Sequence, residues 1–240
     1  IVLGIILGNT LYPHIASMCA SGVGVAKQQL LRTGIVLYGL RITFQQIAGV
    51  GINAILTDGL VLSSTFLLAY WVGTRIFKLD RDTALLIGAG SSICGAAAVM
   101  ATEPIVRPQA SKVSIAVATV VVFGTAGMFL YPALYHLGLT VLPIFQTQNS
   151  YGVYVGSTIH EVAQVFAAGQ AIGPKAADIA VIVKMIRVMM LAPFLLLLSG
   201  WLRLRSANLS EQSRKITIPW FAVLFVVMAG INSLQWLPAS

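Results

Sequence analysis

The sequence predicts an all-α membrane protein, a polytopic helical bundle with interrupted helices and internal repeats. Two observations carry this prediction. First, 58% of the 240 residues are hydrophobic and only 9% are charged, with a mean hydropathy of +0.88, whereas soluble domains carry about 25% charged residues. Second, a glycine- and hydroxyl-rich segment occurs twice inside membrane-length apolar sequence, and transporters build substrate sites from such interrupted segments.

Apolar segments recur along the chain, and we judge them against the roughly 20 residues that a spanning helix needs. The expected segments are residues 1–8 (the end of one helix), 30–47, 52–77, 83–102, 113–137, 151–169, 179–202 and 218–237. Prolines and glycines separate several of them. Residues 203–215 are the longest polar stretch and predict a loop. We therefore expect a single transmembrane domain over residues 1–240, with no separate soluble domain.

The charge pattern fits a membrane protein better than a nucleic-acid-binding one. The formal net charge is +8, but most Lys and Arg residues lie in connections between apolar segments, and no basic-aromatic patch is present. Because cytoplasmic loops are rich in Lys and Arg, the connections around residues 75–81 and 203–215 are predicted to be cytoplasmic. The two cysteines, Cys19 and Cys94, make no disulfide framework.

The repeated segment comprises residues 90–101 (GSSICGAAAVMA) and 156–167 (GSTIHEVAQVFA), which are identical at six of twelve positions. Shorter similarities follow each copy, so the repeating unit is predicted to be an interrupted helix followed by a long helix. The alternative is convergence, because apolar helices resemble one another in composition. The repeat alone leaves open whether the two copies run parallel or antiparallel.

The hydroxyl groups of the repeat are candidate ligands for an anion. Ser91 and Ser92 lie in the first copy, and Ser157 and Thr158 lie in the second. Glycine and local hydroxyl bonding both weaken a helix, and a break would expose the backbone N–H groups that begin the next half-helix. Such N–H groups carry partial positive charge and suit an anion. The alternative is close helix packing through small residues.

Glu161 is the most informative single residue because an ionised side chain in mid-membrane costs at least about 2.5–3.5 kcal/mol. It is expected to be protonated, ion-paired or in a wet cavity, and each state suits a site that couples transport to H⁺ or Na⁺. Its neighbour His160 can titrate near neutrality. Gln164 stands where a zinc protease helix needs its second histidine, so no metal site is predicted.

Lys184 and Arg187 lie one turn apart on one face of the segment 179–202. Arg187 lies too far inside the predicted membrane segment for its side chain to extend easily to the membrane surface. Together the two cations can contact a dianion. The alternatives are that Lys184 extends to the membrane interface and that Arg187 forms a structural pair with Glu161.

Residues 88–98, 156–165, 184–193 and 215–221 together resemble the YeiH-like family of bacterial inner-membrane proteins, and the likeness covers essentially the whole chain. This family is often labelled as sulfate exporters and is distantly similar to bile-acid-symporter-like transporters. The resemblance implies a multi-pass inner-membrane protein with inverted repeats and crossed broken helices. Because family members usually run further at both ends, it also implies that N- and C-terminal helices are missing here.

The expected function is secondary active transport of a small anion, sulfate or a sulfonate, coupled to H⁺ or Na⁺ through Glu161. The predicted substrate-binding residues are Ser91, Ser92, Cys94, Ser157, Thr158, His160, Gln164, Lys184 and Arg187. No cofactor is expected, and ATP hydrolysis is improbable because no Walker-type loop is present. The expected partners are the anion and the lipid bilayer, with a homo-oligomer left open. The alternatives are an intramembrane enzyme that uses Glu161 and His160, and an anion channel.

Overall fold

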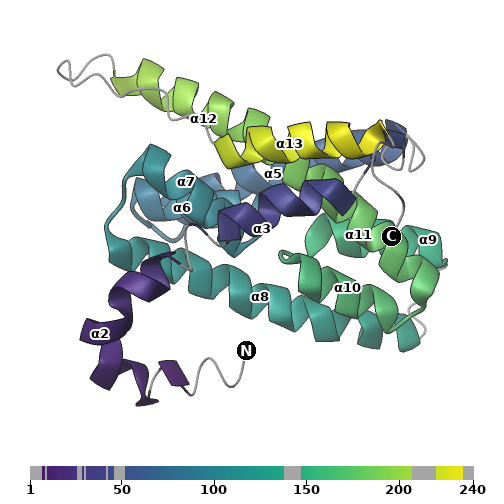
Figure 1. The fold of residues 1–240 in the computed structure, drawn as a ribbon, viewed down its shortest axis with the longest axis horizontal. Helices are drawn as coiled ribbons and strands as arrows, with labels where there is room; N and C mark the ends of the chain where they lie inside the picture. The colour runs from purple at the N-terminus through teal and green to yellow at the C-terminus, as the bar shows by residue number, and fades with distance from the viewer. Residues whose placement is uncertain are drawn as a thin grey trace.

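The computed structural model describes residues 7–8, 10–25, 29, 31–41, 43–45, 52–137, 147–206 and 220–234, among which there is no strand. The helices gather into one bundle, with α8 along one side and α12 and α13 along the opposite side (Figure 1). They are α2 (Tyr12–Val25), α3 (Leu31–Tyr38), the 3₁₀ helix η2 (Gly39–Arg41), α5 (Ile52–Arg75), α6 (Arg81–Ser92), α7 (Ala96–Val106), α8 (Ala110–His136), α9 (Gln148–Thr158), α10 (Val162–Gln170), α11 (Pro174–Met189), α12 (Leu191–Ser206) and α13 (Trp220–Ser233).

Three helical stretches in the described part are long and apolar enough to cross a membrane. They are residues 56–75 in α5, residues 110–136 in α8, and residues 174–202, which run through α11 into α12. Each reaches the roughly 20 residues that a bilayer core requires. The prediction of an all-α membrane bundle is confirmed.

Two predicted apolar segments are interrupted helices. The segment 83–102 is divided into α6 and α7 by a break at residues 93–95, and the segment 151–169 is divided into α9 and α10 by a break at residues 159–161. Gly95 has a φ of +64°, which glycine adopts more easily than residues with a Cβ. Both breaks fall directly after the hydroxyl residues of the repeat, so those residues end the first half-helix and do not begin the second.

The same order of elements occurs twice. The broken pair α6–α7 is followed by the long helix α8, and the broken pair α9–α10 is followed by α11. In both units the first half-helix packs against the helix that follows the pair. This order agrees with the predicted repeating unit of an interrupted helix and a long helix.

Close helix packing places α9 directly on α11. A Cβ on Gly152 would lie 2.8 Å from the carbonyl oxygen of Ala176, and a Cβ on Gly156 would overlap the carbonyl oxygen of Ala180. Glycine at these positions lets the two backbones approach, as small residues do between membrane helices. This contact fixes the second broken helix on the helix that carries Lys184 and Arg187.

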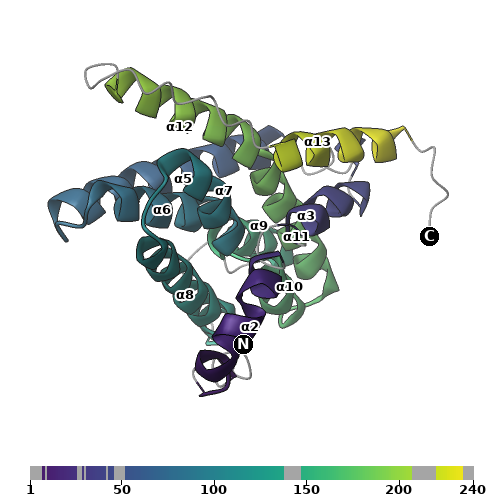
Figure 2. The ribbon, with the colours of Figure 1, turned by 60° about the vertical axis from the view of Figure 1, so that its left-hand side comes forward.

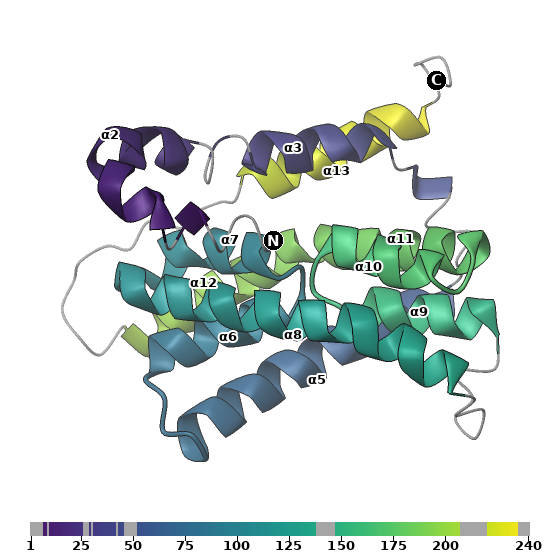
Figure 3. The same ribbon diagram turned by 90° about the horizontal axis from the view of Figure 1, so that it is seen from below.

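Several predicted boundaries differ from the structure. Helix α2 lies between two predicted apolar segments and was not predicted, because its glycines and Pro13 are residues that usually interrupt helices. Pro13 is compatible with the helix because it lies in the first turn, where proline is tolerated. Helix α7 runs through Pro104 to Val106, and α12 continues to Ser206 into the predicted polar loop. The α3–η2 unit ends at Arg41, short of the predicted residue 47, and it lies beside α13 (Figure 3). Most of the segment 1–8, and residues 207–219 and 235–237, lie outside the described residues.

Candidate functional site

The two helix breaks meet in the interior of the bundle. A Cβ on Gly95 in the first break would lie 3.1 Å from Cγ of Glu161 and 3.2 Å from Cβ of His160 in the second break. Positions that are far apart in the sequence are therefore in direct contact, and a side chain at position 95 would press against the second break. The meeting of the breaks defines the candidate site.

Lys184 of α11 joins the two breaks. Its Nζ donates hydrogen bonds to the carbonyl oxygens of Ile93, at 2.5 Å, and Ile159, at 2.8 Å, and the side chain is fully buried. Ile93 and Ile159 follow the last residues of α6 and α9, where helix dipoles place partial negative charge. A single cation thus stabilises the C-terminal ends of both first half-helices. The alternative that Lys184 extends to the membrane interface is wrong.

Arg187, one turn further along α11, is ion-paired with Asp58 of α5. Nη2 of Arg187 lies 2.6 Å from Oδ1 of Asp58, and Nε donates a hydrogen bond to the same oxygen at 2.8 Å. Both side chains are buried. The alternative of an ion pair between Arg187 and Glu161 is therefore wrong, because Arg187 pairs with Asp58. The pair connects α5 to the helix that carries Lys184.

Glu161 and its neighbours form the more open part of the site. Glu161 is half-buried and precedes the first residue of α10. Gln164 is buried on α10 and donates a hydrogen bond from Nε2 to Oγ1 of Thr125 on α8, at 3.1 Å. Oε1 of Gln164 and Nδ1 of His160 are buried with no hydrogen-bond partner among the described residues. These two atoms remain available for a bound molecule or water.

The four predicted hydroxyl ligands have different environments. Thr158 donates a hydrogen bond to the carbonyl oxygen of Tyr154 at 2.7 Å, and Ser92 donates one to that of Ala89 at 3.3 Å, both within their own helices. Ser91 is half-buried. Ser157 is buried near the Asp58 carboxylate. The structure thus places Ser157 next to the charged groups, whereas Ser92 and Thr158 bond to the turns that they end.

Comparison with known proteins identifies the family. The whole chain, residues 1–240, matches the family described as Conserved hypothetical protein 698. The chain belongs to this family. A UPF0324 membrane protein of Pseudomonas aeruginosa is 64% identical over 240 residues, which cover 99% of this chain and 68% of the relative. The UPF0324 inner membrane protein YeiH of Escherichia coli K12 is 59% identical over 240 residues, which cover 100% of this chain and 68% of the relative.

The predicted YeiH-like family is therefore confirmed, and this family member is a multi-pass inner-membrane protein. No solved structure gives a significant match to the chain.

At the site of this protein, the N-terminal ends of α7 and α10 carry partial positive charge from their backbone N–H groups. Neither N-cap residue contributes a side-chain hydrogen bond: Gly95 precedes α7, and Glu161 precedes α10 without bonding to its first turn. Uncapped N–H groups at a helix start favour an anion. The buried Cys94 lies in the first break, beside this region.

Sequence reasoning missed Asp58. The sequence analysis did not single out this residue, whereas the structure buries it completely. A signal was present, because Asp58 is the only acidic residue in the segment 52–77. The argument from the cost of burying a charge, applied to Glu161, applies equally to Asp58.

Proposed function

We propose that this protein is a secondary active transporter that moves a small anion, sulfate or a sulfonate, across the bacterial inner membrane. The observation that carries the proposal is the contact between two interrupted helices, bridged by Lys184. Non-helical backbone at membrane depth is tolerated only where it is buried in protein or lines a cavity. Discontinuous helices that meet near mid-membrane are the usual substrate sites of secondary transporters.

The substrate class follows from the polarity of the site. The uncapped N-terminal ends of α7 and α10 favour negative charge. Lys184 places its amino group close to both breaks. Because Arg187 is already neutralised by Asp58, we assign it a structural role in the resting site. The anion would then be held by the helix ends, Lys184 and Ser157.

Coupling to H⁺ or Na⁺ is assigned to Glu161. This carboxyl group is half-buried at the contact between the breaks, so a change in its charge would alter the site directly. Its electrostatic interaction with Lys184 connects it to both broken helices. Binding of a proton or a cation to Glu161 would thus change the balance between two arrangements of the helices, and rocking of one helix group against another would provide alternating access.

The intramembrane-enzyme alternative has weaker support. Its thiol candidate, Cys94, is 6% exposed, and thiol nucleophiles act from partly exposed, electropositive positions. The transporter proposal predicts that Cys94→Ser retains anion flux. A channel would require a continuous polar stripe, and the sequence contains none.

The decisive experiment is flux measurement with the purified, complete protein in proteoliposomes. Sulfate, sulfite and taurine are compared, with and without a pH gradient or a sodium gradient. The proposal predicts saturable flux of at least one of these anions and accumulation that depends on one of the gradients. Flux that rises linearly with concentration would indicate a channel. No flux of any of the three anions above protein-free liposomes would overturn the proposal.

A further inference from the structure

A second ligand site is indicated by an apolar groove on the outside of the bundle. The groove has a volume of about 540 Å³ and lies between α5 and α12, which run along the same edge of the bundle (Figure 2). Its walls are formed mainly by Leu62, Phe66, Leu67, Phe194, Leu197 and Leu198. Leu67 and Leu197 are 63% and 75% exposed, so the groove opens at the surface of the bundle.

The length of the groove matches one leaflet of a bilayer. One end is at Gly59 and Met190, next to the buried Asp58–Arg187 pair, and the other end is at Tyr70 and Trp201. From Gly59 to Tyr70, α5 advances about 16 Å at roughly 1.5 Å per residue. Half of the hydrocarbon core of a bilayer is about 15 Å thick. The groove therefore fits an acyl chain that extends from the membrane interface to the bilayer centre.

A cation is positioned at the interfacial end of the groove. The Arg81 guanidinium carbon lies 5.0 Å from the centre of the Trp201 ring, and this ring packs edge-on against Tyr70. Nε and Nη2 of Arg81 have no hydrogen-bond partner among the described residues, and no carboxylate in that part of the chain pairs with it. A half-buried cation without a counter-ion is unfavourable. An anionic group at this position would compensate its charge.

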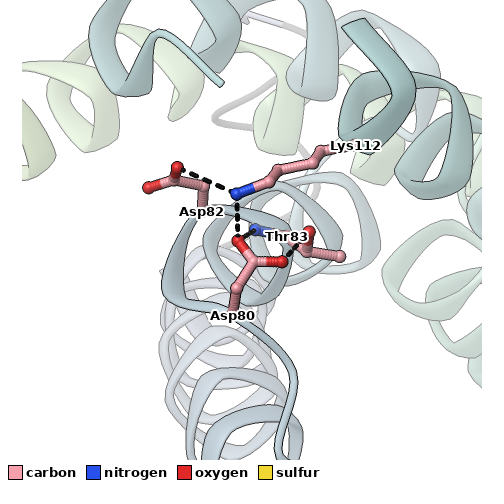
Figure 4. A network of polar contacts seen from close by, with 4 residues as sticks. All are labelled: Asp80, Asp82, Thr83 and Lys112. Atoms are coloured by element: carbon pink, nitrogen blue, oxygen red, sulfur yellow. Dashed lines mark hydrogen bonds and ion pairs between the residues drawn. The ribbon is translucent and has the colours of Figure 1, made fainter. Parts of the chain in front are cut away.

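The acidic neighbours of Arg81 are engaged elsewhere. Asp80 and Asp82 both bind Nζ of Lys112, at 2.6 and 3.3 Å, and Asp80 also accepts hydrogen bonds from Thr83 (Figure 4). The exposed residues Arg75 and Lys78 add two positive charges to the same connection. The connection between α5 and α6, counted together with Lys112, therefore carries four positive and two negative charges. Its net charge favours an anionic ligand.

We propose that this groove binds an anionic phospholipid, with one acyl chain between α5 and α12 and the phosphate beside Arg81. The aromatic pair Tyr70–Trp201 lies at the level where chain and headgroup meet, as aromatic residues do at membrane interfaces. The sequence predicts that this connection is cytoplasmic, and the cytoplasmic leaflet contains anionic lipids that attract Lys and Arg. The bound lipid bridges α5 to α12 on the outer side of the bundle.

Quenching of tryptophan fluorescence by lipids with brominated acyl chains tests this proposal. In the complete protein, Trp71, Trp220 and Trp236, with any tryptophans beyond residues 1–240, are replaced by Phe, so that Trp201 is the only tryptophan. The protein is reconstituted into mixed vesicles in which either phosphatidylglycerol or phosphatidylcholine carries the bromine atoms. We expect phosphatidylglycerol to bind at Trp201 about fivefold more tightly than phosphatidylcholine, the effect of one cation on an anionic lipid.

Two variants identify the residue that recognises the headgroup. Arg81→Gln should abolish the preference, whereas the matched change Lys78→Gln, at an exposed lysine of the same connection, should leave most of it. Equal quenching by the two brominated lipids in the parent protein would overturn the proposal without reference to any variant. Absence of quenching by either lipid would show that protein fills the groove, and would also overturn it.

Discussion

Arg187 of α11 forms a buried ion pair with Asp58 of α5, with Nη2 2.6 Å from Oδ1. This pair lies one helical turn from Lys184, which binds the two helix breaks. Helix α11 therefore carries two cations with different roles. Lys184 joins the broken helices to each other, and Arg187 joins them to α5.

Loss of one partner of this ion pair is expected to destabilise the protein strongly. Asp58→Asn leaves the Arg187 charge buried without a counter-ion, which costs about 3–5 kcal/mol in such cases. A lower melting temperature in detergent measures this effect. The double variant Asp58→Leu/Arg187→Met should recover much of the loss because it removes both charges. The matched control Asp178→Asn, at an exposed position, should melt like the parent. Additive losses in the double variant would contradict the assigned pairing.

Lys184→Met is expected to loosen the contact between the helix breaks. It removes hydrogen bonds to the carbonyl oxygens of Ile93 and Ile159, each worth about 1.5–3 kcal/mol when the donor is charged. Thermal unfolding and anion flux should both be impaired. Lys175→Met is the control, because Lys175 is exposed at the start of the same helix. Flux at the parent level in Lys184→Met would remove Lys184 from the proposed site.

Glu161→Gln is expected to separate accumulation from exchange. The variant keeps the shape of the side chain but cannot change its charge, so gradient-driven accumulation should be lost while exchange of anion across the membrane continues. Both are measured in proteoliposomes with labelled substrate. Glu103→Gln, a change at a half-buried glutamate of α7, should leave accumulation intact. Unchanged accumulation in Glu161→Gln would exclude this residue as the coupling group.

Gly156→Ala is expected to separate α9 from α11. The added Cβ would overlap the carbonyl oxygen of Ala180 and lie 2.9 Å from Cβ of Val183. Overpacking of this kind costs about 1–3 kcal/mol, so the melting temperature should fall. Gly200→Ala is the matched control, since a Cβ there meets nothing within 4 Å. In that exposed helical position alanine should stabilise by about 0.5–1 kcal/mol. Similar melting temperatures of the two variants would contradict the close α9–α11 contact.

The Asp80–Lys112 contact predicts a pH-dependent contribution to stability outside the membrane. Hydrogen bonds from Lys112 and Thr83 lower the pKa of Asp80 from its ordinary 3.8 to about 2. Because the folded-state pKa is the lower one, the stabilisation is present above about pH 4 and is lost as the pH falls through about 2. Asp80→Asn should therefore lower the melting temperature at neutral pH.

The difference between Asp80→Asn and the parent should shrink as the pH is lowered and disappear near pH 2. Melting temperatures recorded over this range provide the test. Asp178→Asn again serves as the control, with no comparable change across the same range. A constant difference between Asp80→Asn and the parent would show that the ionised carboxylate of Asp80 is not the source of the stabilisation.

Some of the site was accessible from residue patterns alone. A Gly-Ser pair inside an apolar segment weakens a helix through backbone freedom and local hydroxyl bonding, so both interruptions were predictable to within a few residues. The exact position of each break was not, because Ser92 and Thr158 bond to carbonyl oxygens of their own helices and remain helical.

The amino-acid order was sufficient for the membrane class, the helix interruptions and the presence of charges that must face inward. These properties depend on composition and on neighbours within a few turns. The partner of each charge depended on how the helices pack, because Asp58 and Arg187 are separated by more than half of the chain. Apolar helices show no strong sequence preference for which face meets which helix, since lipid and protein interiors are equally apolar. The close packing of α9 on α11 and the contact between the two breaks determine which helix faces meet, and therefore which charged groups become partners.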